Sequence, residues 1–156
     1  MRAQEEMKRV VEEYSSALLR AAYSLLKNRE DAEDAVQEAF LRYMERAPEF
    51  ASREHEKAWL LRVTVNIGKN HLASAWSRKR AELHEDIPAL EPEERELLEL
   101  VLKLPAKYRA VIHLYYYEGY SLPEISQILR SPLSTVTTRL SRARKRLAAL
   151  LKEDAE

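Results

Sequence analysis

Hydroxyl and basic side chains recur at three- and four-residue spacing near the C-terminus, where they can pair with a polar or anionic partner. One face of a helix through this segment carries Thr135, Thr138, Arg139 and Arg142, with Thr137 and Ser141 beside them. The opposite face is apolar, with Val136, Leu140 and Ala143. Hydroxyl and guanidinium groups on an exposed helix face pair with base edges or phosphates in the major groove of DNA. Three further cations follow, for which we expect contacts to phosphates rather than bases: Arg144, Lys145 and Arg146.

The charge distribution concentrates basic residues in this part of the chain. The 26 basic and 26 acidic residues cancel overall, which taken alone argues against nucleic-acid binding. Between Ser121 and Lys152, however, seven basic residues stand against Glu124 alone, which gives a net charge of +6. A basic last helix also complements its own dipole, so charge by itself leaves both interpretations open.

A short capped helix precedes the basic one. Ser121-Leu-Pro-Glu124 has the pattern of a capping box with proline in the first turn, and it predicts a helix through Leu129. The last helix then begins near Ser131-Pro132 and runs to about residue 151. A short helix, a tight turn and a longer basic helix form a helix-turn-helix, whose second helix enters the major groove. This arrangement favours DNA binding over a helix that is merely basic.

A second candidate surface is acidic. Glu30, Asp34 and Glu38 follow one another at four-residue spacing in a helix that Asn28 is placed to cap. Like charges at this spacing destabilise a helix by roughly a few tenths of a kcal/mol each, and the helix dipole favours acids only in the first turn. The face is therefore either ordinary solvated surface or a docking face for a basic partner helix.

The third predicted helix carries amides beside cations. One face holds Arg62, Asn66, Lys69 and Asn70, and we expect Trp59, Val63 and Ile67 on the other side. Asparagine is a poor helix former, so two of them on one face favour a use such as hydrogen bonding to exposed bases. Arg78, Lys79 and Arg80 extend the basic region past Trp76. The alternative is a solvated polar face.

Other chemistry is missing from the sequence. There is no cysteine, so disulfides, thiolate zinc sites and thiol catalysis are excluded. The four histidines have no metal-ligand spacing, and no phosphate-binding loop, nucleophile elbow or carboxylate pair is visible. We therefore expect no cofactor, no metal and no enzymatic activity. No apolar run approaches a membrane span and the first residues are not a signal peptide, so we expect a cytoplasmic protein without membrane insertion.

The elements that position these surfaces are all predicted to be helices. Only 2 Gly and 6 Pro interrupt 156 residues, and runs of β-branched residues are absent. Apolar periodicity predicts helices over residues 7–25, 28–47, 56–77, 93–103, 105–119, 121–129 and 131–151, with a loop over 47–54. The three consecutive tyrosines, 115–117, are expected to contribute helix packing and surface. A proline-bearing stretch over 81–92, in a region of net charge −7 from Glu82 to Glu99, is predicted to be a flexible linker between modules 1–80 and 93–156.

Together these motifs resemble the extracytoplasmic-function group of sigma-70 family RNA polymerase sigma factors. The first module carries Asp31-Ala-Glu-Asp-Ala-Val-Gln-Glu-Ala-Phe-Leu41 and Trp59-Leu-Leu-Arg-Val-Thr-Val-Asn66. The second carries Leu104-Pro, Arg109, Glu118-Gly-Tyr-Ser-Leu-Pro-Glu-Ile125 and Thr135-Val-Thr-Thr-Arg-Leu-Ser-Arg-Ala-Arg144. The resemblance covers nearly the whole chain and implies an all-α fold. A sigma-two-like three-helix-type bundle would occupy residues 1–80, and a sigma-four-like helix-turn-helix domain residues 93–156.

The resemblance also implies roles for the three surfaces. The acidic helix would dock on the clamp coiled coil of the polymerase β′ subunit through Asp31, Asp34, Gln37 and Glu38. The third helix and the loop over 50–57 would open the minus-ten element and hold a flipped base, through Asn66, Lys69 and Asn70. The last helix would read the minus-thirty-five element through Thr137, Thr138, Ser141 and Arg142, while its flank meets the β flap. An anti-sigma factor is a further implied partner.

The sequence departs from the family pattern in and after the turn that precedes the last helix. Arg130-Ser131 stands where many members have glycine and an apolar residue, Ser134 replaces a frequent glycine, and Thr137 replaces a frequent basic residue. We expect the fold and the membership of this family to be unaffected by these differences, but the promoter sequence does not follow from the resemblance. Two other functions stay open from the residues alone: a stand-alone helix-turn-helix regulator and a helical adaptor that binds only proteins.

Overall fold

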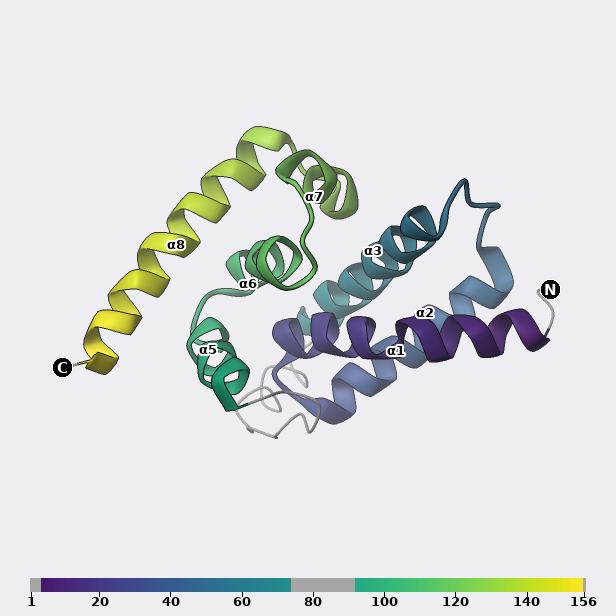
Figure 1. Cartoon of the computed structure of the whole chain (residues 1–156), viewed down its shortest axis with the longest axis horizontal. Helices are drawn as coiled ribbons and strands as arrows, with labels where there is room; N and C mark the ends of the chain where they lie inside the picture. Colours follow the sequence, from purple (N-terminus) through teal and green to yellow (C-terminus); the bar gives the residue numbers. More distant parts are fainter. Residues whose placement is uncertain (1–3, 74–91, 156) are drawn as a thin grey trace. The chain divides into compact units, whose positions relative to one another are not determined.

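A computed structural model describes residues 4–73 and 92–155, and every regular element in those ranges is a helix (Figure 1). The predicted all-α fold is therefore confirmed. The chain divides into two compact units, Met1–Glu85 and Asp86–Glu156. Apart from Pro92, the predicted linker over 81–92 lies outside the described residues, as do Trp76 and the cations at 78–80.

The first unit is a bundle of three helices. These are α1 (Gln4–Leu26), α2 (Arg29–Arg46) and α3 (Arg53–Leu72), and each packs against the other two. Their shared core contains fully buried side chains from all three helices, including Leu18, Leu26, Tyr43, Leu60 and Leu61. Because large apolar side chains meet at the centre, the three helices present their remaining faces to solvent as fixed surfaces.

Side-chain caps set where two of these helices begin. The Asn28 side chain accepts a hydrogen bond from the Asp31 backbone N–H at 2.9 Å, as its position predicts. Ser52 caps α3 in the same way, accepting from the His55 N–H at 3.2 Å. Serine is a strong N-cap, so α3 begins three residues before the predicted start at residue 56.

A buried carboxylate ties the three helices together. Glu56 of α3 is 5% exposed and accepts hydrogen bonds from Arg9 Nη2 at 3.0 Å, Tyr14 Oη at 2.8 Å and Tyr43 Oη at 2.6 Å. Burial acts to raise the pKa of Glu56, but the hydrogen bonds from Arg9, Tyr43 and Tyr14 outweigh it and lower that pKa. Burial and the same carboxylate raise the pKa of Tyr14 to about 12. Sequence reasoning did not identify this network.

The second unit is built around its last helix. Its elements are α5 (Pro92–Leu102), α6 (Ala106–Ile112), the π-helical turn η1 (His113–Tyr117), α7 (Leu122–Leu129) and α8 (Leu133–Ala155). Helices α5, α6 and α7 all contact α8. The core includes Val101, Ile112, Leu114, Ile125 and Val136, each at most 1% exposed.

The segment before the helix-turn-helix ends as predicted. Gly119 has a φ of +75°, a left-handed conformation that glycine adopts without strain, and it stops the helix after η1. Nearby, Arg109 is 5% exposed and donates to the Leu104 carbonyl. Burial lowers the pKa of Arg109 to about 10. This arginine thus stabilises the turn between α5 and α6 from inside the core.

The helix-turn-helix has the predicted capping. The Ser121 N–H donates to Glu124 Oε1 at 2.9 Å, and the Glu124 N–H donates to Ser121 Oγ at 3.3 Å, which completes the capping box. The backbone hydrogen bond from Ser121 lowers the pKa of Glu124. Arg130 then turns the chain in a left-handed conformation, with φ of 52°, and α8 begins at Leu133.

Candidate nucleic-acid and protein interfaces

Helix α8 exposes the hydroxyl and basic groups expected of it, but their arrangement differs from the prediction. Val136, Leu140 and Ala143 are buried, as expected. The predicted opposite face included Thr135 and Arg139, which are only half-exposed. Arg139 follows Val136 by three residues, which places the two side chains about 60° apart around the helix axis. Arg139 therefore flanks the core face of α8 rather than lying opposite to it. The exposed candidates are Thr137, Thr138, Ser141, Arg142 and Lys145.

Tyrosines of α6 and η1 contact two of the cations of α8, Arg144 and Arg146. Arg144 Nε donates to Tyr116 Oη at 2.7 Å, and the guanidinium lies 5.4 Å from the centre of the Tyr115 ring. Arg146 lies 5.1 Å from the centre of the Tyr108 ring. In the part of the chain that the structure describes, Arg142 and Lys145 make no ion pair or hydrogen bond through their side chains.

The three cations for which phosphate contacts were predicted therefore differ in their surroundings. Of the three cations predicted to meet phosphates, Arg144 and Arg146 are held against aromatic rings, whereas Lys145 extends from the helix without a described partner. The tyrosines were expected to contribute only packing and surface. Their three-residue run next to a basic helix was the available signal, because arginine stacks readily on aromatic faces.

The acidic face of α2 consists of three of its four predicted members. Asp34, Gln37 and Glu38 are exposed, and Glu38 pairs with Arg42 at 2.7 Å. Asp31 is 1% exposed, and its Oδ2 lies 3.3 Å from His71 Nε2 of α3. The Asp31 side chain therefore lies inside the bundle and does not belong to the surface that a partner can meet.

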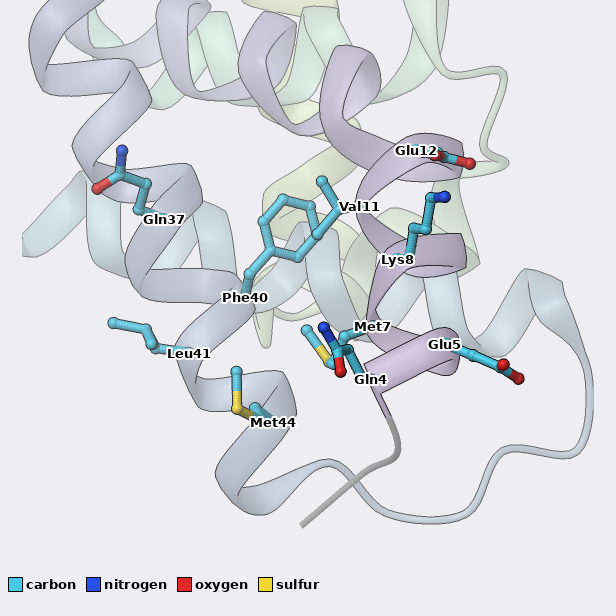
Figure 2. A pocket seen from close by; sticks show the side chains of 10 residues that line it. All are labelled: Gln4, Glu5, Met7, Lys8, Val11, Glu12, Gln37, Phe40, Leu41 and Met44. Carbon is cyan, nitrogen blue, oxygen red and sulfur yellow. The ribbon is translucent and has the colours of Figure 1, made fainter.

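An open apolar groove of about 890 Å³ lies between α1 and α2, next to the acidic face. Figure 2 shows Phe40 and Val11 pointing toward one another across it, with Met7 and Met44 at one end. Leu41 is 55% exposed and Val11 39% exposed. The complete lining is Gln4, Glu5, Met7, Lys8, Val11, Glu12, Gln37, Phe40, Leu41 and Met44.

The apolar periodicity of the sequence did not identify this groove, because that periodicity does not separate a groove-lining side chain from a buried one. Phe40 is only half-buried, and it lines the groove from α2. The available signal was Phe40-Leu41, two large apolar residues in succession, since consecutive residues point about 100° apart and both cannot face one core. Exposed apolar side chains gathered in one groove are typical of an interaction site.

The polar face of α3 is present, but the aromatic residue lies on a different side from the one predicted. Arg62, Asn66 and Lys69 are half-exposed and Asn70 is exposed. Trp59 was expected on the opposite side. Trp59 and Asn66 are seven residues apart, however, so their side chains lie within about 20° of each other around the helix axis and share one side of α3. Ile67, which was also expected on the other side, is buried, and the remaining buried residues of α3 are Glu56, Leu60, Leu61, Thr64, Val65 and Gly68.

Trp59 also joins this face to the preceding loop. Its ring lies edge-on to Phe50 at 5.9 Å and to Tyr43 at 6.0 Å between ring centres. Phe50 stacks on Tyr43 at 6.1 Å. The loop before α3 is thus anchored beside the amides of α3 by three aromatic rings. The predicted loop over 50–57 is shorter in the structure, because residues 53–57 belong to α3.

Comparison with known proteins decides the family. Residues 10–78 match the model for sigma-70 region 2, and residues 81–147 match the model for sigma-70 region 4. The ECF RNA polymerase sigma factor SigW of Bacillus subtilis is 32% identical, over 92% of this chain and 88% of its own length. The chain belongs to the ECF group of sigma-70 family sigma factors. This ECF sigma factor is also 29% identical to the RNA polymerase sigma-H factor of Pseudomonas aeruginosa, over 92% of this chain and 87% of that one.

Solved structures agree with the family. The structure of CnrH in complex with the cytosolic domain of CnrY superposes with a TM-score of 0.70 at 28% identity, covering 97% of this chain and 91% of CnrH. The sigma factor RpoE, solved with the anti-sigma factor NepR from Bartonella quintana, shares the fold with a TM-score of 0.75. That match has 24% identity and covers 95% of this chain and 98% of RpoE.

Membership of this family establishes what kind of molecule the chain is. It is a transcription initiation factor that directs RNA polymerase to promoters, and it is not an enzyme. The two alternatives, a regulator acting without polymerase and an adaptor without DNA binding, are therefore set aside. Among the helices of residues 4–73 and 92–155, none is long and apolar enough to cross a membrane.

Proposed function

We propose that the sigma factor divides promoter recognition among three separate surfaces. Helix α8 reads the minus-thirty-five element, the polar face of α3 with the loop before it captures the melted minus-ten element, and α2 docks on polymerase. The observation that carries this proposal is the exposed set Thr138, Ser141, Arg142 and Lys145 on the second helix of a capped helix-turn-helix.

For the minus-thirty-five element, the exposed residues supply complementary chemistry. A guanidinium such as that of Arg142 can pair in a bidentate manner with guanine, and the hydroxyls of Thr138 and Ser141 can pair with several bases. Lys145 lies further along α8 and supplies a phosphate contact. Thr135 and Arg139, which are half-exposed, contact the groove edge rather than its floor.

For the minus-ten element, uncharged donors and cations stand together. Asn66 and Asn70 offer amides that pair with the edges of unstacked bases, while Arg62 and Lys69 approach the backbone. The Phe50–Trp59 contact holds the loop before α3 against this face. An unstacked base held by hydrogen bonds beside fixed aromatic rings is favoured over the duplex state, which assists opening.

For polymerase, we propose that the clamp coiled coil of the β′ subunit lies along α2. Asp34, Gln37 and Glu38 supply polar and acidic contacts, and the apolar groove with Leu41 at its rim supplies burial. This combination of an apolar centre and a charged margin is that of a specific protein interface. Asp31 acts indirectly, through its buried position at the start of α2.

The domain organisation completes the proposal. Domains 1–80 and 93–156 are joined by the acidic linker 81–92, so two modest DNA contacts held on one polymerase become a selective pair. The flank of α8 meets the β flap. The factor works in the cytoplasm, where polymerase and promoters are found. The related CnrH was solved with a protein partner, the cytosolic domain of CnrY, and an anti-sigma factor, which the family resemblance implies, is a further proposed partner.

Run-off transcription with core polymerase tests the proposal. Genomic promoter fragments that yield transcripts only with this factor would define its two elements. Base changes at minus thirty-five should then reduce binding by the holoenzyme, and a preopened minus-ten bubble should bypass the need for the α3 face. Transcription that is indifferent to both elements would contradict the proposed division.

A further inference from the structure

Thr137 differs from its exposed neighbour Thr138 in how its hydroxyl is used. Thr137 Oγ1 donates a hydrogen bond to the Leu133 carbonyl, one helical turn earlier, at 2.9 Å. Thr138 is also exposed, and its side chain makes no hydrogen bond within the described residues. Both lie in the N-terminal part of α8, the part of a recognition helix that meets base edges.

The internal hydrogen bond limits what Thr137 can offer to DNA. Threonine carries a hydroxyl and a methyl on Cβ, in staggered positions. With the hydroxyl proton directed at the helix backbone, the group that remains for a base edge is the γ-methyl. The hydroxyl oxygen keeps lone pairs, so an amino group of adenine or cytosine is the competing partner.

We infer that Thr137 selects thymine in the minus-thirty-five element by contact between its γ-methyl and the thymine C5-methyl. Apolar contact from a threonine methyl is one of the ways in which the major groove is read. The neighbouring Thr138 reads through its hydroxyl instead, and Arg142 through its guanidinium. This inference rests on the proposed role of α8 at the minus-thirty-five element.

Replacing thymine by deoxyuridine removes the C5-methyl and leaves base pairing unchanged, which makes it the direct test. Each thymine of the minus-thirty-five element is replaced in turn, and promoter binding is measured with the complete holoenzyme. At one position, we expect the replacement to weaken binding by the wild-type factor about fourfold, the value of one buried methyl. Thr137→Val, which keeps the methyl, should retain this sensitivity, and Thr137→Ser should lose it.

Thr138 supplies the matched control. Thr138→Ser keeps the hydroxyl and should bind like the wild type, whereas Thr138→Val should bind more weakly, with unchanged sensitivity to deoxyuridine at the Thr137 position. Circular dichroism of each variant checks that α8 still forms.

The outcomes separate this inference from the proposed function. If the promoter depends on minus thirty-five but no thymine is sensitive to deoxyuridine, or if Thr137→Ser keeps the sensitivity, methyl reading is wrong. If Thr137→Val loses the preference while Thr137→Ser keeps it, the hydroxyl reads the base. If randomising the whole minus-thirty-five element leaves wild-type binding unchanged, the proposed role of α8 itself fails.

Discussion

At the scale of single residues, Arg142 and Lys145, two α8 cations without a described partner, should have different effects on DNA binding. Arg142→Ala should relax preference at one or two base pairs by roughly tenfold to a hundredfold, because a bidentate base contact discriminates by about 1–3 kcal/mol. Lys145→Ala should weaken all sequences alike and lower the salt slope by about one phosphate contact. Holoenzyme binding to matched and mutated promoters over a range of salt concentrations measures both. Equal effects of the two variants would contradict the assignment.

Glu56 should make the stability of the first unit depend on pH. Its pKa is lower in the folded state than in the unfolded chain, so its contribution is complete above the unfolded value of about 4.3 and is lost as pH falls through the folded value. Glu56→Gln should therefore cost about 1–3 kcal/mol near pH 7 and less below about pH 4. Urea denaturation of the wild-type factor and the variant at both pH values gives the comparison. A cost that does not change with pH would show that ionisation of Glu56 is irrelevant.

At the scale of elements, α2 provides a test of polymerase docking. Asp34→Lys and Glu38→Lys should each weaken binding to core polymerase without unfolding the bundle, since the helix does not need this acidic face. Glu38→Lys also loses the pair with Arg42, which is worth at most about 0.5 kcal/mol. Glu99→Lys, an exposed acid on α5 of the second unit and outside the proposed docking face, is the matched control and should bind normally. Pull-down with core enzyme and circular dichroism separate docking from folding.

The elements are also where prediction from sequence succeeded best, for physical reasons. Apolar periodicity and local caps act over one or two turns, so Asn28, the Ser121 capping box and Gly119 could be identified from neighbouring residues. What escaped prediction depends on the packing of helices distant in sequence. Asp31 is buried beside His71 of α3, and the pKa of Glu56 is lowered by hydrogen bonds that include the one from Arg9 of α1. No local pattern contains that information.

The candidate surfaces illustrate the same limit. Residue types on α3 and α8 predicted which helices carry polar chemistry, but helical angle decided which members face solvent, as Trp59 and Arg139 show. The groove between α1 and α2 arises only where two helices meet. Its apolar lining follows the same three- and four-residue spacing as the core, so periodicity alone could not separate an interaction surface from a buried one.

At the scale of the whole molecule, the separation into two units predicts where a protease cuts. Limited proteolysis of the free factor should cut first within residues 81–92, because the proline-bearing acidic stretch there joins two compact units. Two resistant fragments should result, identified by mass spectrometry. A first cut within residues 59–70, inside α3, would contradict this organisation.

Substitutions in the DNA-binding surfaces of the two units should affect different steps of initiation, namely strand opening for the first unit and promoter recognition for the second. Asn66→Ala removes an uncharged amide from the first unit, so closed-complex affinity and its salt dependence should stay nearly intact. Loss of one hydrogen bond to an unstacked base should shift the opening equilibrium by roughly two- to tenfold. Arg142→Ala in the second unit should do the reverse, altering promoter preference before opening. Permanganate reactivity of minus-ten thymines, measured beside promoter binding for both variants, compares the two steps. If Asn66→Ala changed the minus-thirty-five preference, or if Arg142→Ala impaired melting on a promoter that it still bound, the two surfaces would not act at separate steps.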